Sequence, residues 1–274
     1  MKCFCGGKDA ILLFQSGLYD VVRCAVCGQV RTLGCSGAKR TGYYTEDNVR
    51  FYIDHQEMFR ALFRKLLGFI QTYAPSGTLL DIGAGVGILL DEARTMGYRI
   101  RGVEPSRASV AAAKKYFGIQ LINTEFCNVV PSKTFKKIRG DIKNIDIIVI
   151  NHVLEHMDNP KKIIELCATT LRDAGVLVIG VPNFDSFMRV LKRGRWQSLI
   201  PEQHRWQFSL RTLDQLVVSY GFRRIAVSYD NHDRAMHYWW KRPVYAILDW
   251  IATRVGWGEA MLVIYRKQSN NVTK

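Results

Sequence analysis

An acid and three glycines recur at every second position, as Asp81, Gly83, Gly85 and Gly87, at the end of a short apolar run. Glycines in a turn between a strand and a helix let backbone N–H groups approach a ligand closely, because no Cβ stands in the way. A second acid, Glu104, ends the next apolar run, where a carboxylate can accept hydrogen bonds from both hydroxyls of a ribose. Together these residues predict a nucleoside-binding site.

The spacing of the glycines argues against a dinucleotide site, because the pattern G-x-G-x-x-G requires a glycine where this chain has Ile88. The acid followed by three alternating glycines resembles motif I of the class I S-adenosylmethionine (SAM) methyltransferases. The resemblance implies that Asp81 and the glycines hold the methionine end of SAM and that Glu104 holds its ribose. It also implies an adenine contact between Asn123 and Phe126.

The resemblance extends from Leu79 to about Val227. The motifs that carry it are Asp81 to Gly87, Gly102-Val-Glu-Pro-Ser106, Val153-Leu-Glu-His156, Gly175 to Asn183, and His204 ahead of Phe208-Ser209. They are similar to a branch that includes the ubiquinone-pathway O-methyltransferase and many sugar and natural-product methyltransferases. Some deoxysugar C-methyltransferases of this kind carry a small N-terminal zinc module.

Strand-like and helix-like stretches alternate along the chain. Strands are expected at 79–82, 98–103, 119–122, 145–150, 176–181, 222–227 and 261–265, and helices at 51–73, 88–96, 106–117, 160–171 and 209–220. The expected fold is α/β, a doubly wound, Rossmann-like class I methyltransferase sheet with a small N-terminal zinc-ribbon-like module. Since such sheets bind ligands at the carboxyl ends of their strands, the predicted cofactor rim also includes Asn151 and the adjoining His152.

His156 and His204 are the predicted general bases, with Glu155 as the residue that orients them. Methyl transfer from a sulfonium is an in-line displacement, in which the protein mainly aligns donor and acceptor. A hydroxyl or a carbon acid must also lose a proton, and a neutral imidazole near pH 7 can accept it. The alternative is that His156 only packs the turn and that Glu155 only accepts backbone hydrogen bonds.

The run His152-Val-Leu-Glu155-His156 also matches the H-x-x-E-H signature of zinc peptidases. That signature lies within a helix, whereas this run leaves a central strand, so a peptidase is excluded. The quinone O-methyltransferases show E-x-x-E-H at the matching place, linked to a divalent cation. Because His152 replaces the first acid here, a cation at His152, Glu155 and His156 is left open.

Four cysteines near the N-terminus, Cys3, Cys5, Cys24 and Cys27, are predicted to hold a structural zinc ion. The glycine after each pair lets backbone N–H groups approach the thiolates. The first pair is C-x-C rather than the usual C-x-x-C, and Cys35 could replace one ligand. Reduced thiols without metal are the alternative. Four thiolates would leave no open coordination position, which argues against a catalytic metal.

The length of 274 residues accommodates one large domain and a small module. We expect a zinc-ribbon-like module over 1–40, a linker and helix over 41–75, and a SAM-binding domain over 76–274 with a helical insert at 231–258. The sequence shows neither a run of about 18 apolar residues nor a leader-like start, so a cytoplasmic location is expected. Oligomeric state is not predicted.

The net charge of +15 raises nucleic acid as a partner. The charge is spread along the chain, however, and Asn151 to Leu154 lacks the Pro-Pro-aromatic tetrad of base-amino methylases. The preferred acceptor is a small molecule: a sugar, a nucleotide-sugar, a lipid-linked precursor or a quinone-type ring. An RNA methyltransferase and a non-catalytic SAM-fold subunit are the alternatives. The segment 236–256 is expected to form a lid or packing helix, with membrane-surface contact or dimerisation as further alternatives.

Overall fold

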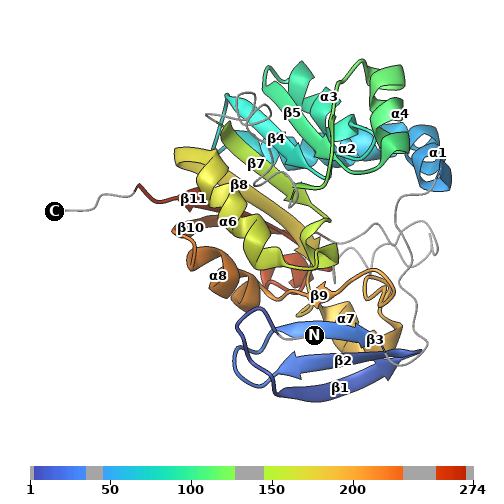
Figure 1. The fold of residues 1–274 in the computed structure, drawn as a ribbon, viewed down its shortest axis with the longest axis vertical. Coiled ribbons are helices and arrows are strands. Elements are labelled where there is room, and N and C mark those ends of the chain that lie inside the picture. Colours follow the sequence, from blue (N-terminus) through green and yellow to red (C-terminus); the bar gives the residue numbers. More distant parts are fainter. Residues whose placement is uncertain (1–2, 35–45, 127–144, 231–250, 270–274) are drawn as a thin grey trace.

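The computed structural model of the chain describes residues 3–34, 46–126, 145–230 and 251–269. A seven-stranded sheet covered by helices forms the larger part, and a four-stranded sheet built mainly from the N-terminal segment lies beside it (Figure 1). Within these described ranges, no helix is long and apolar enough to cross a bilayer.

The large sheet confirms the expected doubly wound α/β fold. Across the sheet the strands lie in the order β10 (Phe222–Asp230), β11 (Ala260–Lys267), β8 (Leu171–Pro182), β7 (Ile145–Asn151), β4 (Thr78–Ile82), β5 (Arg99–Glu104) and β6 (Ile122–Asn123). Strands β4 to β8 are parallel, and β11 runs antiparallel to both β8 and β10. Because β4 pairs with both β5 and β7, the strand order reverses at β4, which is where ligands bind in such sheets.

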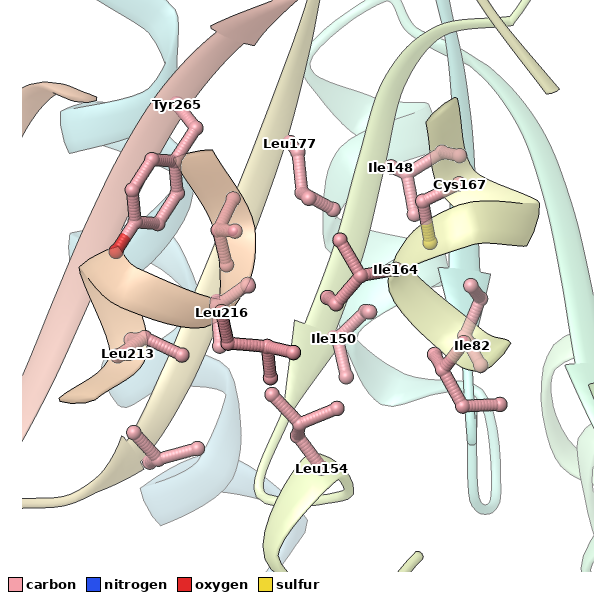
Figure 2. Close-up of a cluster of buried hydrophobic side chains, with 14 of the residues drawn as sticks. Ile82, Ile148, Ile150, Leu154, Ile164, Cys167, Leu177, Leu213, Leu216 and Tyr265 are labelled. Carbon is pink, nitrogen blue, oxygen red and sulfur yellow. The ribbon is translucent and has the colours of Figure 1, made fainter. Parts of the chain in front are cut away.

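Helices cover both faces of this sheet because its central strands are apolar on both sides. Ile148 and Ile150 of β7 pack with α6 (Pro160–Thr170) and α8 (Leu210–Val218), in the cluster shown in Figure 2. Ile147 and Val149 point to the other face, into a cluster with α2 (Gln56–Gln71), α3 (Ile88–Thr95) and α4 (Arg107–Phe117). Both clusters hold the strand ends of the predicted rim in place.

Most predicted helix starts are confirmed by their caps. The side chains of Ser106, Asn159 and Ser209 accept hydrogen bonds from the first turns of α4, α6 and α8. The helix expected over 51–73 is two helices, α1 (Glu46–Asp54) and α2, which separate at the non-helical His55. The strand expected over 119–122 was placed too early: the backbone of Ile119 still bonds to α4, so β6 begins at Ile122.

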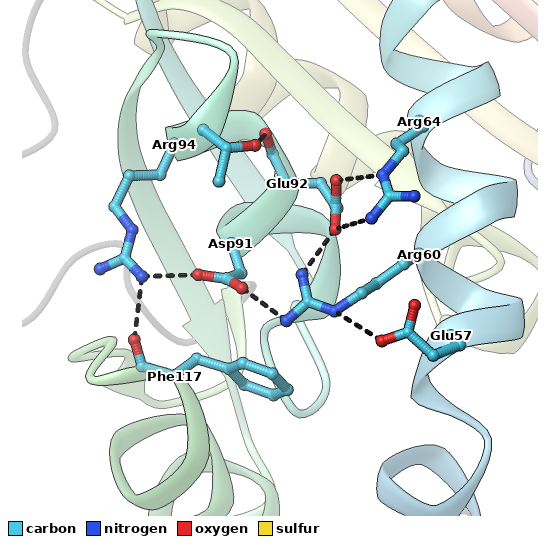
Figure 3. A network of polar contacts seen from close by, with 8 residues as sticks. Glu57, Arg60, Arg64, Asp91, Glu92, Arg94 and Phe117 are labelled. Atoms are coloured by element: carbon cyan, nitrogen blue, oxygen red, sulfur yellow. Dashed lines mark hydrogen bonds and ion pairs between the residues drawn. The ribbon is translucent and has the colours of Figure 1, made fainter.

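A network of ion pairs fixes α2 against α3 (Figure 3). Arg60 of α2 donates to Asp91 at 2.7 Å and to Glu92 at 2.5 Å, and its side chain is 16% exposed. Arg64 contacts Glu92 at 2.8 Å, and Arg94 contacts Asp91 at 2.5 Å. The network therefore holds the helix that starts directly after the glycine turn.

The small sheet is completed by a strand from the distant segment that follows His204. Its order is β1 (Ala10–Ser16), β2 (Tyr19–Cys24), β3 (Val30–Gly34) and β9 (Trp206–Gln207), all antiparallel. The predicted N-terminal module therefore shares a sheet with residues predicted to belong to the SAM-binding domain. Most of the predicted insert at 231–258, and of the segment 236–256, lies outside the described residues, although 251–254 are helical.

Candidate functional site

The glycine turn joins β4 to α3 in a conformation that favours glycine. Gly83, Gly85 and Gly87 have φ angles of 79°, 54° and 88°, in the left-handed region. A Cβ at Gly83 would lie 2.5 Å from a methyl carbon of Val153, whereas a Cβ at Gly85 would meet nothing within 4 Å. The turn is thus tightly packed at Gly83 and open at Gly85, where a ligand can approach the backbone.

Glu104, at the carboxyl end of β5, is held across this turn by backbone groups. Its Oε2 accepts a hydrogen bond from the N–H of Gly85 at 2.9 Å, and its Oε1 accepts one from the N–H of Ser106 at 2.8 Å. Burial raises the pKa of Glu104, and these two hydrogen bonds oppose the rise. Each oxygen keeps a further acceptor position, as a ribose diol requires.

Asp81, near the end of β4, is a second buried carboxyl on the same rim. Burial, with a smaller contribution from the nearby charge of Glu104, raises the pKa of Asp81 to about 7. An ammonium group brought next to it would restore the ionised form, since an opposite charge lowers a carboxyl pKa.

Asn151 and His152 follow β7 on the rim next to β4. The Asn151 side chain lies across Gly180 of β8, where an added Cβ would come within 2.1 Å of its Oδ1. His152 has a φ of 54°, which is uncommon for a residue with a side chain, and its N–H donates to the carbonyl of Gly180 at 2.8 Å. Backbone outliers of this kind are enriched at functional sites.

Glu155, His156 and His204 lie together, although about fifty residues separate the two histidines. Glu155 and His156 belong to the short 3-10 helix η2 (Leu154–His156), and their ligand atoms and that of His204 all lie within 4.8 Å of one another. The two imidazole rings meet edge to face with centroids 4.7 Å apart. The predicted catalytic residues therefore form one cluster.

Burial and hydrogen bonding decide the charge states in this cluster. Burial is the largest single effect on Glu155 and raises its pKa. The hydrogen bond with His152 Nδ1 at 3.3 Å and the charges of the three nearby histidines together outweigh burial and lower the pKa. Burial lowers the pKa of His204 to about 4, so its imidazole is neutral near pH 7. His204 Nδ1 contacts the carbonyl of Ser198 at 2.9 Å, which assigns the proton to Nδ1 and leaves Nε2 as the acceptor.

Sequence reasoning missed the backbone partners of this cluster and one buried cation. The carbonyl of Gln203 lies 3.3 Å from His156 Nδ1, and the carbonyl of Ser198 orients His204. Contacts to backbone carbonyls cannot be predicted from residue types.

The buried cation is Arg31 of β3, which is 2% exposed and lies opposite Trp206 in the strand pairing of β3 with β9. Its Nε and Nη1 have no hydrogen-bond partner within the described part of the chain.

The four predicted metal cysteines meet at one end of the small sheet. The sulfurs of Cys3 and Cys27 are 3.5 Å apart, those of Cys5 and Cys24 are 3.6 Å apart, and all four lie within 4.8 Å of one another. None of the four forms a disulfide. Cys35, the predicted substitute ligand, lies outside the described residues.

Comparison with solved structures places the fold among the methyltransferases. A SAM-dependent methyltransferase from Archaeoglobus fulgidus aligns over 79% of this chain and 99% of its own, with a TM-score of 0.56 and 16% identity. The plantazolicin methyltransferase BpumL in complex with SAH aligns over 81% and 90%, with a TM-score of 0.54 and 16% identity. At these identities the likeness shows the fold alone.

Curated relatives share about a quarter of the aligned residues. The ubiquinone biosynthesis O-methyltransferase of Rhodopseudomonas palustris (strain TIE-1) is 26% identical over 155 residues, which cover 50% of this chain and 59% of the relative. Its counterpart in Glaesserella parasuis serovar 5 is 29% identical over 106 residues, covering 38% and 45%. The chain thus spans about half the length of the curated relatives that it matches.

A family model described as a methyltransferase domain matches residues 54–227, which is more than half of the chain. The matched segment runs from α1 to β10 and includes the glycine turn, Glu104 and the cluster around Glu155. The chain therefore belongs to the methyltransferase domain family.

Proposed function

We propose that the protein is a class I SAM-dependent methyltransferase that methylates a small molecule, with an oxygen as the acceptor atom. The observation that carries the proposal is the rim at the β4 switch point, where an open glycine turn faces a carboxylate already fixed by two backbone N–H groups. The family assignment supports the reaction class. The names of the relatives support an oxygen acceptor, and sugar, nucleotide-sugar, lipid-linked and quinone-type acceptors all fit the proposal.

The residues of the rim fit SAM. SAM supplies an electrophilic methyl group on a sulfonium, together with an ammonium, a carboxylate and a ribose diol. In the proposal Glu104 accepts the ribose hydroxyls, Asp81 ionises beside the cationic methionine end, and the open turn at Gly85 gives the ligand access to the backbone. Asn151 and His152, on the next strand end, complete the cofactor-binding set.

The histidine cluster supplies the proton acceptor. A hydroxyl acceptor must lose its proton when it is methylated, and the Nε2 of a neutral imidazole would take up that proton. His204 is neutral near pH 7, and His156 lies edge to face with it. The ionised carboxylate of Glu155 stabilises the imidazolium that forms.

One atom in the cluster favours a divalent cation as an alternative to a bare histidine base. Glu155 Oε2 is buried and has no hydrogen-bond partner among the described residues, so it needs a donor or a cation. Carboxylate and imidazole together suit several divalent metals. In this alternative the ligands are Glu155, His156 and His204, whereas the sequence pattern pointed to His152 as the third.

We also propose that the four cysteines hold a structural zinc ion. A tetrahedral site with zinc–sulfur bonds of about 2.3 Å places its sulfurs about 3.8 Å apart. The two measured separations, 3.5 Å and 3.6 Å, are close to this spacing. The donor set therefore fits zinc, and the ion would join the first turn of the chain to the β2–β3 connection.

Calorimetric titration with SAM tests the cofactor site. Glu104→Gln removes the charge but keeps the shape, and because hydrogen bonds to a charged group contribute about 1.5–3 kcal/mol, we expect SAM affinity to fall about 10- to 100-fold. Glu165→Gln, at an exposed position of α6, is the matched control and should leave the affinity unchanged. Equal SAM affinities in the two variants would show that Glu104 does not bind the cofactor.

A further inference from the structure

A cavity of about 760 Å³ opens on the side of the molecule where the small sheet meets the segment after α7 (Phe187–Lys192). Residues 15–17, at the β1–β2 turn, form one wall, and residues 191–195 form the other. The walls are joined by the hydroxyl of Ser16, which donates to the carbonyl of Gly194 at 3.4 Å. None of these residues belongs to the SAM rim or to the histidine cluster.

The second wall carries three cations, Lys192, Arg193 and Arg195. Within the part of the chain that the structure describes, none of them makes an ion pair with a carboxylate, and Lys192 donates only to the amide of Gln197, at 3.3 Å. Other cations of the protein pair with acids, among them Arg60, Arg64, Arg94, Arg172 and Arg224. The positive charge of this cavity is therefore left available to a ligand.

The backbone at Arg193, one of the three cations, has an uncommon conformation. Arg193 follows α7 with a φ of 48°, in the left-handed region where glycine would be favoured. Gly194 faces β1, where an added Cβ would be in ordinary van der Waals contact, 3.4 Å from both the Phe14 ring and the carbonyl of Gln15. Arg193 and Arg195 flank Gly194 in the chain, and both are exposed.

We propose that this cavity binds a phosphate or diphosphate group of a phosphorylated ligand. Guanidinium groups match phosphate oxygens with paired N–H donors, and a cleft lined by one sign of charge attracts the opposite sign. The cavity volume is in the range of small-ligand sites. Leu191, 66% exposed, adds an apolar contact for the rest of the ligand. The proposal does not depend on methyl transfer.

Calorimetry with inorganic pyrophosphate at low ionic strength tests the site on the full chain, without SAM. We expect Lys192→Gln/Arg193→Gln/Arg195→Gln to weaken binding at least about tenfold, because it removes all three cations. Lys114→Gln/Lys161→Gln/Lys162→Gln, at exposed positions of α4 and α6, removes the same net charge elsewhere. Equal losses in the two triple variants would overturn the proposal.

A second pair of variants tests the cavity without removing an arginine. Gly17 has a φ of 57°, which Asn and Asp also tolerate, and a Cβ there meets nothing within 4 Å. Gly17→Asp places a carboxylate at the cavity wall and should weaken pyrophosphate binding about tenfold, whereas the isosteric Gly17→Asn should change it less than about twofold. Identical binding by these two variants would contradict the site.

Flotation with phosphatidylcholine vesicles, with and without phosphatidic acid, distinguishes the source of the phosphate. Binding to the acidic vesicles that pyrophosphate displaces and that the cavity variants lose assigns the site to a lipid headgroup. Pyrophosphate binding without vesicle binding assigns it to a soluble phosphorylated molecule. Binding of neither probe overturns the proposal, and SAM titration of the same samples shows separately whether the cofactor site is intact.

Discussion

At the residue scale, the two buried carboxyls on the predicted cofactor rim, Glu104 and Asp81, differ in the groups that act on their pKa values. Glu104 accepts two backbone N–H groups, which oppose the effect of burial on its pKa. Burial and the Glu104 charge together raise the pKa of Asp81 to about 7. Asp81 is therefore the carboxyl whose protonation should change most when a cationic ligand binds next to it.

The stability of the protein should depend on pH through Asp81. Its folded-state pKa is above its ordinary value of 3.8, so the folded state binds the extra proton and stability falls as pH rises from about 4 to about 7. Asp81→Asn lacks this ionisable group. We therefore expect the free energy of unfolding in urea to fall by about 4 kcal/mol more in the wild type than in Asp81→Asn between those pH limits. Parallel pH curves for the two proteins would contradict the assignment.

Removal of the proton acceptor should slow transfer without weakening SAM binding. His156→Gln keeps a polar side chain that cannot take up a proton, and we expect the rate of methyl transfer to fall about 100-fold at unchanged SAM affinity. His204→Gln should act in the same direction, since the two rings are in contact. His55→Gln, at an exposed position before α2, serves as the control and should transfer normally.

At the element scale, the ion pairs between α2 and α3 join a peripheral helix to the helix that begins directly after the glycine turn. Arg60 is mostly buried and pairs with two acids, whereas Arg64 is 57% exposed and pairs with one of them. Without Arg60, Glu92 keeps only its pair with Arg64 and Asp91 keeps only its pair with Arg94, and both of these arginines are largely exposed. Losing the mostly buried cation should therefore cost more than losing an exposed pair.

The two arginines should therefore differ in urea unfolding. We expect Arg60→Ala to reduce the free energy of unfolding by about 3 kcal/mol, because two charge-assisted hydrogen bonds to mostly buried acids are lost. Arg64→Ala should reduce it by less than about 1 kcal/mol. Both variants replace an arginine of the same helix by alanine, so the change in helix propensity is the same in the two and does not separate them. Similar losses in both would show that the burial of Arg60 does not control its contribution.

The sequence predicts elements well where local chemistry defines their ends. Residue types alone identify three kinds of feature. These are the helix caps at Ser106, Asn159 and Ser209, the glycines of the turn, and the strand β7, which is apolar on both faces. The break at His55 and the late start of β6 have no such signature, because tertiary packing decides them. For the same reason the sequence could suggest the same role for His156 and His204, but it could not predict that their rings are in contact.

At the scale of the whole molecule, β9 joins the cysteine-bearing sheet to the methyltransferase domain. Val30 and Arg31 pair with Gln207 and Trp206, and Trp206 packs against Phe4, which lies between Cys3 and Cys5 in the chain. Its indole N–H donates to the carbonyl of Met157, beside His156. No sequence pattern predicted this strand, because it is two residues long and pairs with a segment 175 positions away.

Metal removal should therefore affect the entire chain rather than the N-terminal segment alone. We expect one zinc ion per chain by elemental analysis and a single thermal transition, whose midpoint a strong chelator lowers by about 5 °C or more. Cys24→Ser should lose the zinc and show the lower midpoint without chelator. Two separate transitions, with only the first sensitive to the chelator, would contradict the shared-sheet arrangement.

The most direct test of the central claim is methyl transfer from methyl-labelled SAM to a fractionated extract of the source cells by the purified protein. We predict label in a low-molecular-weight or lipid fraction with the wild type, a strong reduction with Glu104→Gln, and full transfer with Glu165→Gln. Label confined to RNA would contradict the small-molecule assignment. The absence of label in every fraction, with SAM bound normally, would contradict catalysis itself.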